Sequence, residues 1–364
     1  MDATLAFPLL IGLIAVALFF DFLNGLHDAA NSIATVVATR LLSPVRAVLF
    51  AAVFNFAAYF LTIAFPALHA VAETIGKGLV DKDIVTPAVI FGALGGAMFW
   101  NVLTWMKGIP SSSSHALIGG LIGAGVAHGG LTGIHWGGLN KTLLAIVLSP
   151  TLGMLLAMLV MLVSSWLLHR ATARTAERSF RGLHLLSSAA YSLSHGLNDA
   201  QKTMGIITVL LYSTGNLTGE FHVPHWVAIS CYIAIALGTM TGGWKIIETM
   251  GSRITKLSQH QGFSASLAGS IVLFSASALG IPVSTTHTIT GSIIGAGTAR
   301  RASAVRWGVA QSVVMRGARI RVRIDSDGGD PHLLGGAHHT ARNLTAIGDQ
   351  DLLEHQRLAL LAGV

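Results

Sequence analysis

The segment GLHDAANS (25–32) brings carboxylate and amide side chains into a chain that is otherwise strongly apolar. On an α-helix, Asn24, Asp28 and Asn31 lie on one face because they are separated by four and three residues. Asp21 precedes them on the same stripe. A charged group that faces lipid costs about 3 kcal/mol even on the lenient insertion scale. We therefore expect these four side chains to face a protein interior or a wet cavity, where they could bind an ion.

A second stripe of the same kind lies 171 residues further along the chain. His195, Asp199 and Lys202 occupy the three equivalent positions, and Asn198 lies beside them. Polar groups inside membrane proteins also hold helices together, and for a single Asn or Ser that alternative stays open. An Asp in both copies favours a binding site.

Two Gly-Pro segments add chemistry of another kind: GIPSSSSHALIGGLIGAG (108–125) and GIPVSTTHTITGSIIGAG (280–297). Gly and Pro break a helix, and the hydroxyl residues that follow are suited to start a new one. The free N–H groups and the positive dipole end of that new helix favour an oxyanion. Simple N-capping is the alternative role for these hydroxyls. The residues that we expect near the anion are Ser112, Ser113, Ser114, Ser284, Thr285 and Thr286.

Two histidines, His115 and His287, follow the hydroxyl runs at equivalent positions. They are candidates for a proton relay, with a packing role as the alternative. The Ser/His pairing does not indicate a hydrolase, because no GxSxG elbow is present and a catalytic triad is not duplicated symmetrically. The other histidines are scattered and the lone Cys231 has no partner, so no metal-ligand spacing appears. We expect neither an enzyme nor a metal centre, and no cofactor.

Helices that cross a membrane are needed to position these motifs. Of the 364 residues, 52% are hydrophobic and 11% charged, with a mean hydropathy of +0.65, whereas a soluble domain carries about 25% charged residues. The net charge of +7 lies mostly in short loops and the C-terminal region, so it does not indicate a nucleic-acid partner. The composition predicts an all-α polytopic membrane protein in contact with lipid. The predicted spans are 5–39, 47–66, 86–106, 110–127, 142–168, 184–214, 226–248, 262–281 and 284–299, with a start at 305–315.

The two halves of the chain are copies. The Gly-Pro segments match at 10 of 18 positions with an offset of 172 residues, and NGLHDAANS (24–32) matches HGLNDAQKT (195–203) with an offset of 171. Internal repeats of this kind are typical of transporters. The predicted organisation is a first transmembrane repeat, a basic cytoplasmic connector, a second and incomplete repeat, and an atypical polar tail, at 1–168, 169–183, 184–315 and 316–364.

Loop charge predicts the topology. Arg40, Arg46 and the basic connector HRATARTAERSFR (169–181) should be cytoplasmic by the positive-inside rule, which puts the N-terminus outside. An odd number of spans, about five per repeat, makes the repeats inverted, with their broken helices at the midplane. The loop after the first Gly-Pro motif has no Lys or Arg, whereas the equivalent ARRASAVR (299–306) has three Arg. We expect a multi-pass protein of the inner (plasma) membrane.

The C-terminal region departs from this repeat pattern. The counterpart of the long apolar span that follows Trp136 starts at Trp307 but turns into MRGARIRVRIDSDGGDPHLLGGAHH (315–339). The final span is therefore missing from the pattern, which indicates a change of reading frame near residue 315; a genuine short basic tail is the alternative. We expect low order through 325–347 and a helix near 348–361.

Four segments together resemble the signature segments of the inorganic phosphate transporter (Pit) family, bacterial low-affinity type: DFLNGLHDAANSIAT, GIPSSSSHALIGGLIGAG, HGLNDAQKTMGI and GIPVSTTHTITGSIIGAG. The resemblance runs from about residue 5 to residue 315. It implies an inverted-repeat fold, symport of phosphate with a cation, and a homodimer. The phosphate and cation ligands that it implies are Asp21, Asn24, Asp28, Asn31, Ser112, Ser113 and Ser114 in the first copy, and Asn198, Asp199, Lys202, Ser284, Thr285 and Thr286 in the second.

Two departures from that family pattern bear on the coupling ion. Many relatives carry Asn-Asp in both polar motifs, whereas this chain has His27-Asp28 in the first, and it has Lys202 where the first copy has Asn31. A fixed ammonium can do the electrostatic work of a bound sodium ion, so our hypothesis is coupling to H⁺ rather than Na⁺.

The sequence thus predicts a secondary active transporter that brings inorganic phosphate, free or as a metal–phosphate complex, into the cell by alternating access. The alternatives are a sulfate permease of the same fold, an anion channel, and a transport-inactive truncated copy or sensor. Because phosphate carries an O–H at neutral pH and sulfate does not, carboxylates that face the ligand would favour phosphate.

Overall fold

The computed structural model describes residues 7–81 and 84–310, which belong to one compact unit spanning residues 1–317. Every named element of this part is helical, and one isolated bridge joins Val80 to Ile134. The predicted polar tail at 316–364, with its expected helix near 348–361, lies outside the described residues, as do residues 311–315 of the predicted start of a span at 305–315.

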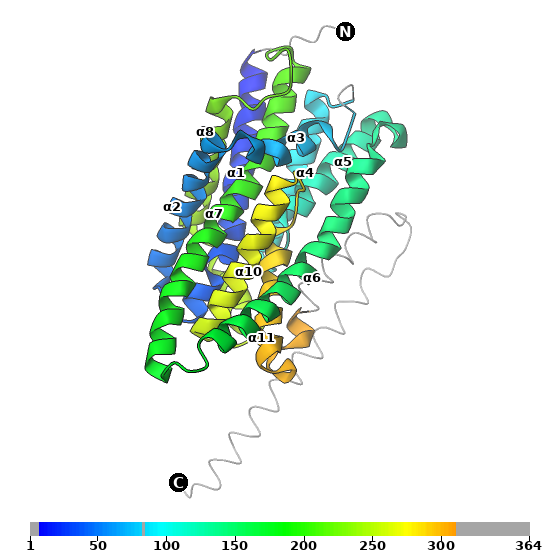
Figure 1. Ribbon diagram of the computed structural model, residues 1–364. Helices are drawn as coiled ribbons and strands as arrows, with labels where there is room; N and C mark the ends of the chain where they lie inside the picture. The colour runs from blue at the N-terminus through cyan, green and yellow to red at the C-terminus, as the bar shows by residue number, and fades with distance from the viewer. Residues whose placement is uncertain (1–6, 82–83, 311–364) are drawn as a thin grey trace, which may run out of the picture. The chain divides into compact units, whose positions relative to one another are not determined.

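The described residues of the first half form six α-helices and short 3₁₀ turns (Figure 1). The predicted spans are confirmed as helices to within a few residues, but a short helix, α3, was not predicted. The α-helices are α1 (Phe7–Ala38), α2 (Pro44–Ala64), α3 (Ala70–Lys77), α4 (Pro87–Met106), α5 (Ser113–Gly129) and α6 (Trp136–Leu167).

The second half follows the same order as far as the structure describes it. The expected span at 226–248 is broken into two helices, which are bent by 72° at Gly242 and Gly243, and this break was not predicted. Gly242 has φ +71°, a conformation that favours glycine. The helices are α7 (Ala173–Ser213), α8 (His225–Thr241), α9 (Trp244–Glu248) with a π turn η3 (Thr249–Arg253), α10 (Gln259–Ala278) and α11 (Thr285–Arg300).

Helices α4 and α10 begin and end 172 residues apart, and α5 and α11 begin 172 residues apart. Helices α4 and α5 form one helical hairpin, and α10 and α11 form the other. The loop of each hairpin carries the Gly-Ile-Pro sequence. In Figure 1 the α4–α5 hairpin lies toward the upper end of the view and the α10–α11 hairpin toward the lower end. The duplicated sequence therefore folds into duplicated elements.

Glycines let the two halves interlock. Helix α1 packs on α8, and α7 packs on α2. A Cβ atom at Gly25 would overlap the backbone carbonyl of Ile235, and one at the equivalent Gly196 would lie 2.5 Å from the Asn55 oxygen. Only glycine allows such close backbone approach. The two polar stripes are thus each held against the second helix of the opposite half.

Within the described residues, four helices are long and apolar enough to cross a membrane: α1, α2, α4 and α6. The bent pair α8–α9 would make a fifth if it is one span. The large apolar side chains of α6 are exposed, among them Leu162 and Trp166, as expected for a helix in contact with lipid. Among the other predicted spans, α5 and α11 are short, with 17 and 16 residues. Helices α7 and α10 are long enough, but buried polar residues interrupt their apolar character, most clearly in α7.

Candidate functional site: a buried polar network between two hairpin tips

The tips of the α4–α5 and α10–α11 hairpins meet beside the middle of α1 and α7. Thr286 at the start of α11 donates a hydrogen bond to the backbone oxygen of Ser111, 3.1 Å away. The rings of His115 and His287 lie 4.9 Å apart, tilted by 59°. Residues from equivalent positions in the two repeats therefore lie together at one place.

Two of the predicted hydroxyl residues cap these helices. The His115 N–H donates to Ser112 Oγ, and the His287 N–H donates to Ser284 Oγ, both at 3.2 Å. N-capping, the alternative that the sequence left open, is the role seen for Ser112 and Ser284. Their downstream neighbours are left to point toward the polar stripes.

The carboxylate of Asp28 receives hydroxyls from both hairpin tips. Ser113 Oγ lies 2.7 Å from Asp28 Oδ2 and 2.5 Å from Asn24 Oδ1, and Thr286 Oγ1 lies 3.3 Å from Asp28 Oδ1. Each hydroxyl has a single proton, and Thr286 also has the Ser111 oxygen as an acceptor. His27 Nδ1 lies 3.1 Å from Asp28 Oδ1. Acceptors therefore outnumber hydroxyl protons around Asp28.

The equivalent Asp199 is balanced by a cation instead. Lys202 Nζ donates to Asp199 Oδ1, and also to Ser114 Oγ at 2.5 Å and to the Val283 oxygen at 3.0 Å. These three bonds use all three protons of the ammonium. Thr285 Oγ1 donates to Asp199 Oδ2 at 3.1 Å. Lys202 thereby ties α7 to the start of α5 and to the loop before α11.

Asn31 joins the two carboxylate centres. Its amide donates to Thr286 Oγ1 at 2.9 Å and to Thr285 Oγ1 at 3.4 Å. All of these side chains are buried. The structure thus gathers nine of the predicted site residues in one hydrogen-bonded network: Asn24, Asp28, Asn31, Ser113, Ser114, Asp199, Lys202, Thr285 and Thr286.

The sequence profile of the phosphate transporter family matches residues 24–316, which include both hairpins and, apart from Asp21, both polar stripes. The chain belongs to this family. A probable low-affinity inorganic phosphate transporter of Rhizobium meliloti (strain 1021) is 64% identical over 86% of this chain and 93% of its own length. A protein of the same name from Bacillus subtilis (strain 168) is 40% identical over the same shares of both chains.

A solved structure described as "the sodium-dependent phosphate transporter" superposes with a TM-score of 0.76. It is 26% identical, and the match covers 86% of this chain and 95% of that one. The fold of this member of the phosphate transporter family is therefore that of a membrane-embedded transporter.

Some predicted site residues of this family member lie outside the network. Asn198 donates to Ser277 Oγ at 3.1 Å, and Asp21 makes no hydrogen bond to the network. The rings of His115 and His287 face each other at the tips, and their part in a proton relay stays a prediction.

Three residues of the site surroundings were not predicted as site residues. His27 Nε2 lies 3.1 Å from Thr104 Oγ1, and His195 Nδ1 lies 3.2 Å from Asn55 Oδ1. Tyr191 donates to the Thr285 oxygen at 3.1 Å. His27 and His195 lie in the duplicated motifs, and this position could have identified them as residues near the site. Tyr191 has no counterpart in the first motif that would have indicated its role.

One group of side chains in the described part of the chain has the geometry of a metal site. Ligand atoms of Asp28, His195 and Asp199 lie within 4.8 Å of one another. Lys202 already neutralises Asp199, and hydroxyl protons already point at both carboxylates. These groups therefore fit a resident divalent cation poorly.

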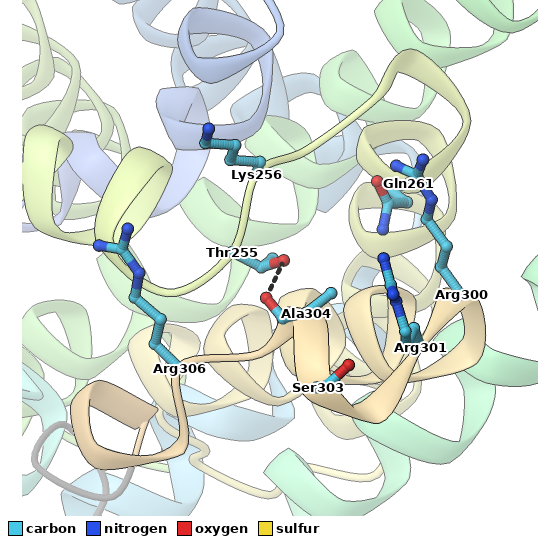
Figure 2. A pocket seen from close by; sticks show the side chains of 8 residues that line it. All are labelled: Thr255, Lys256, Gln261, Arg300, Arg301, Ser303, Ala304 and Arg306. Atoms are coloured by element: carbon cyan, nitrogen blue, oxygen red, sulfur yellow. Dashed lines mark hydrogen bonds between the residues drawn. The ribbon is translucent and has the colours of Figure 1, made fainter. Parts of the chain in front are cut away.

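A separate pocket lies at the C-terminal end of α11 (Figure 2). Its volume is about 310 Å³, and its lining includes Lys256, Arg300, Arg301 and Arg306 but no carboxylate. Thr255 Oγ1 donates to the Ala304 oxygen beside it at 3.1 Å. This cationic end of the transporter shares no lining residue with the buried network.

Proposed function

We propose that the chain is a secondary active transporter that carries inorganic phosphate into the cell together with protons. The observation that carries this proposal is that two hydroxyl protons serve four acceptor oxygens at Asp28 and its neighbours, between two helix N-termini that favour an anion. The relatives are named as phosphate transporters, which supports phosphate as the substrate.

The small number of hydroxyl protons around Asp28 favours phosphate over sulfate as the ligand. A phosphate ion at neutral pH still carries one or two O–H groups, and one of them can donate to Asp28 or Asn24. Sulfate has no proton to donate, so its oxygens would meet the carboxylate directly. Leaving charges unpaired in a buried site is costly. Ser113 and Thr286 would then turn their protons toward the remaining oxygens of the phosphate.

Lys202 supports a proton rather than sodium as the coupling ion. Its ammonium already supplies a positive charge beside Asp199, with all three protons bonded. A sodium ion at that carboxylate would have to compete with it. The structural neighbour is described as sodium-dependent, but Lys202 argues for a different coupling ion in this chain. Phosphate in a metal complex is a second form in which the substrate could arrive.

Alternating access would arise from two inverted repeats that rock against each other. The matched α4–α5 and α10–α11 hairpins, with tips in contact and opposite places in Figure 1, support that arrangement. The cationic end at Arg300 and Arg306 supports a cytoplasmic position for this loop and an N-terminus outside the cell. A homodimer in the inner membrane rests on the resemblance to the Pit family.

A transport-inactive chain is the second candidate, and it has an observation in its favour. The family match ends at residue 316, whereas this chain continues to residue 364. That end point supports the proposal that the sequence after about residue 315 is not that of the family.

Counterflow of labelled phosphate tests the proposed substrate. Purified protein in sodium-free liposomes loaded with phosphate should exchange external labelled phosphate at equal pH on both sides. Excess arsenate, a tetrahedral oxyanion that keeps an O–H, should compete, and excess sulfate should not. Competition by sulfate as strong as that by phosphate would overturn the substrate assignment, and no exchange at all would favour the inactive chain.

A further inference from the structure

Asp21 is the one carboxylate of the buried stripes that the network leaves out. Three carboxylates are buried in the described part of the chain: Asp21, Asp28 and Asp199. Asp28 receives hydroxyl protons, and Asp199 is paired with Lys202. Neither oxygen of Asp21 has a partner in hydrogen-bonding geometry, and its exposed fraction is 0%.

The surroundings of Asp21 provide no cation next to it. Thr203 of α7, Asn24 and Cys231 of α8 are the polar side chains beside it. The charged and titratable groups that reach it from the helices packed on α1 are Asp199 and Lys202 of α7, and Cys231 and Tyr232 of α8. Lys202 is already held by Asp199, so it does not balance a second carboxylate.

A carboxylate that is buried without a hydrogen-bond partner or an adjacent cation is expected to bind a proton. The free energy of an unpaired buried charge is so unfavourable that the group neutralises instead. Asp21 can do so by taking up one proton, whereas Asp28 and Asp199 have partners for their charged forms. Since the carboxyl is inaccessible in this conformation, it would gain and lose its proton only when the site opens to one side or the other.

A structural need does not explain the carboxyl. The equivalent residue of the second repeat is Ser192, which is also fully buried and also has no hydrogen-bond partner for its side chain. An otherwise matched helix therefore packs without a carboxylate at this position. The position is also connected to the anion network, because Asn24 lies beside Asp21 and accepts the Ser113 hydroxyl.

We propose that Asp21 is the residue that carries the coupling proton, at a site separate from the phosphate network. The proton binds Asp21 while the site is open to the outside, and the same proton leaves to the cytoplasm after the transporter has changed conformation. This proposal rests on the proposed function and deepens it by naming the group that couples the two gradients. It replaces the expectation that Asp21 touches phosphate.

The variant Asp21→Asn tests this proposal because the amide imitates a protonated carboxyl that cannot release its proton. In sodium-free proteoliposomes it should keep phosphate counterflow within about threefold of the unsubstituted protein. It should lose accumulation driven by an inward proton gradient, and its counterflow should no longer depend on pH. The matched control is Ser192→Ala, which should retain both activities.

The unsubstituted protein measured in parallel separates the two proposals. If it shows neither counterflow nor accumulation, the proposed function fails, and infrared spectroscopy still tests Asp21. The carbonyl band of a protonated carboxyl should be present in the unsubstituted protein and absent from Asp21→Asn. An unchanged band would overturn the proposal.

Two transport results would also overturn it. Accumulation that persists in Asp21→Asn would mean that another group carries the proton. Loss of counterflow in folded Asp21→Asn would place Asp21 in the anion site. If Asp21→Asn does not fold, Asp21→Glu keeps a titratable group and should retain proton-driven accumulation with a shifted pH profile, and loss of that accumulation with counterflow intact would contradict the proposal.

Discussion

At the residue scale, Asp28 and Asp199 occupy equivalent positions but have different partners. Hydroxyls shared with other acceptors surround Asp28, whereas an ammonium with no proton to spare holds Asp199. We therefore expect the two carboxylates to have different roles. Asp28 can accept a hydrogen bond from an O–H group of the ligand, and Asp199 with Lys202 fixes the geometry around it.

Replacing Asp28 by Asn tests its part as an acceptor. The amide nitrogen would face hydroxyls and remove a charged acceptor, and hydrogen bonds to charged groups are worth about 1.5–3 kcal/mol. We expect the affinity for phosphate in equilibrium binding to fall roughly 10- to 100-fold. The matched control is Ser32→Ala on the same helix, since this buried hydroxyl has no partner and should be dispensable. Unchanged affinity in Asp28→Asn would exclude Asp28 from the site.

Removing the Lys202 ammonium should destabilise the protein. Breaking a buried ion pair by deleting one partner costs about 3–5 kcal/mol, because the other charge is left alone. Lys202→Met should therefore unfold at a lower temperature in detergent. The double variant Lys202→Met with Asp199→Asn should recover most of the loss, because neither charge remains. A single variant as stable as the unsubstituted protein would show that the ion pair does not form.

At the element scale, glycines decide how closely the polar helices approach their partners. Gly25→Ala should lower the unfolding temperature, because the added methyl group would overlap the carbonyl of Ile235 in α8. Overpacking of this kind costs about 1–3 kcal/mol. Gly12→Ala on the same helix meets no atom within 4 Å and should be neutral or stabilising. Equal unfolding temperatures for the two variants would contradict the packing of α1 on α8.

The sequence predicted most elements because duplication and apolar runs give strong local signals. It did not predict the break between α8 and α9. Gly242 and Gly243 lie in an apolar stretch where glycine is common in membrane helices, and the break depends on long-range packing. A Cβ at Gly243 would lie 2.9 Å from the Leu26 oxygen of α1.

The candidate site shows the same limit. Sequence spacing predicted which residues share a helix face, and nine of them meet in the network. It could not separate the caps Ser112 and Ser284 from Ser113 and Thr285, because one residue along a new helix start changes the direction of a hydroxyl by about 100°. It also could not show that Asp21 is left without a partner, since that depends on α7 and α8.

At the scale of the whole molecule, inverted repeats require equivalent loops on opposite sides of the membrane. In a Cys231→Ala background, Thr132→Cys and Ser303→Cys place exposed thiols after the second hairpin helix of each repeat. A membrane-impermeant maleimide applied to intact cells should label Thr132→Cys and not Ser303→Cys until the cells are opened. Labelling of both positions from outside would contradict the inverted topology.

Accumulation of labelled phosphate tests whether the transporter couples phosphate to protons rather than to sodium. Proteoliposomes are prepared in sodium-free buffer, an inward proton gradient is imposed, and a protonophore serves as the control. We expect uphill accumulation that the protonophore abolishes and that added sodium does not increase. Accumulation that requires sodium and ignores the protonophore would contradict it.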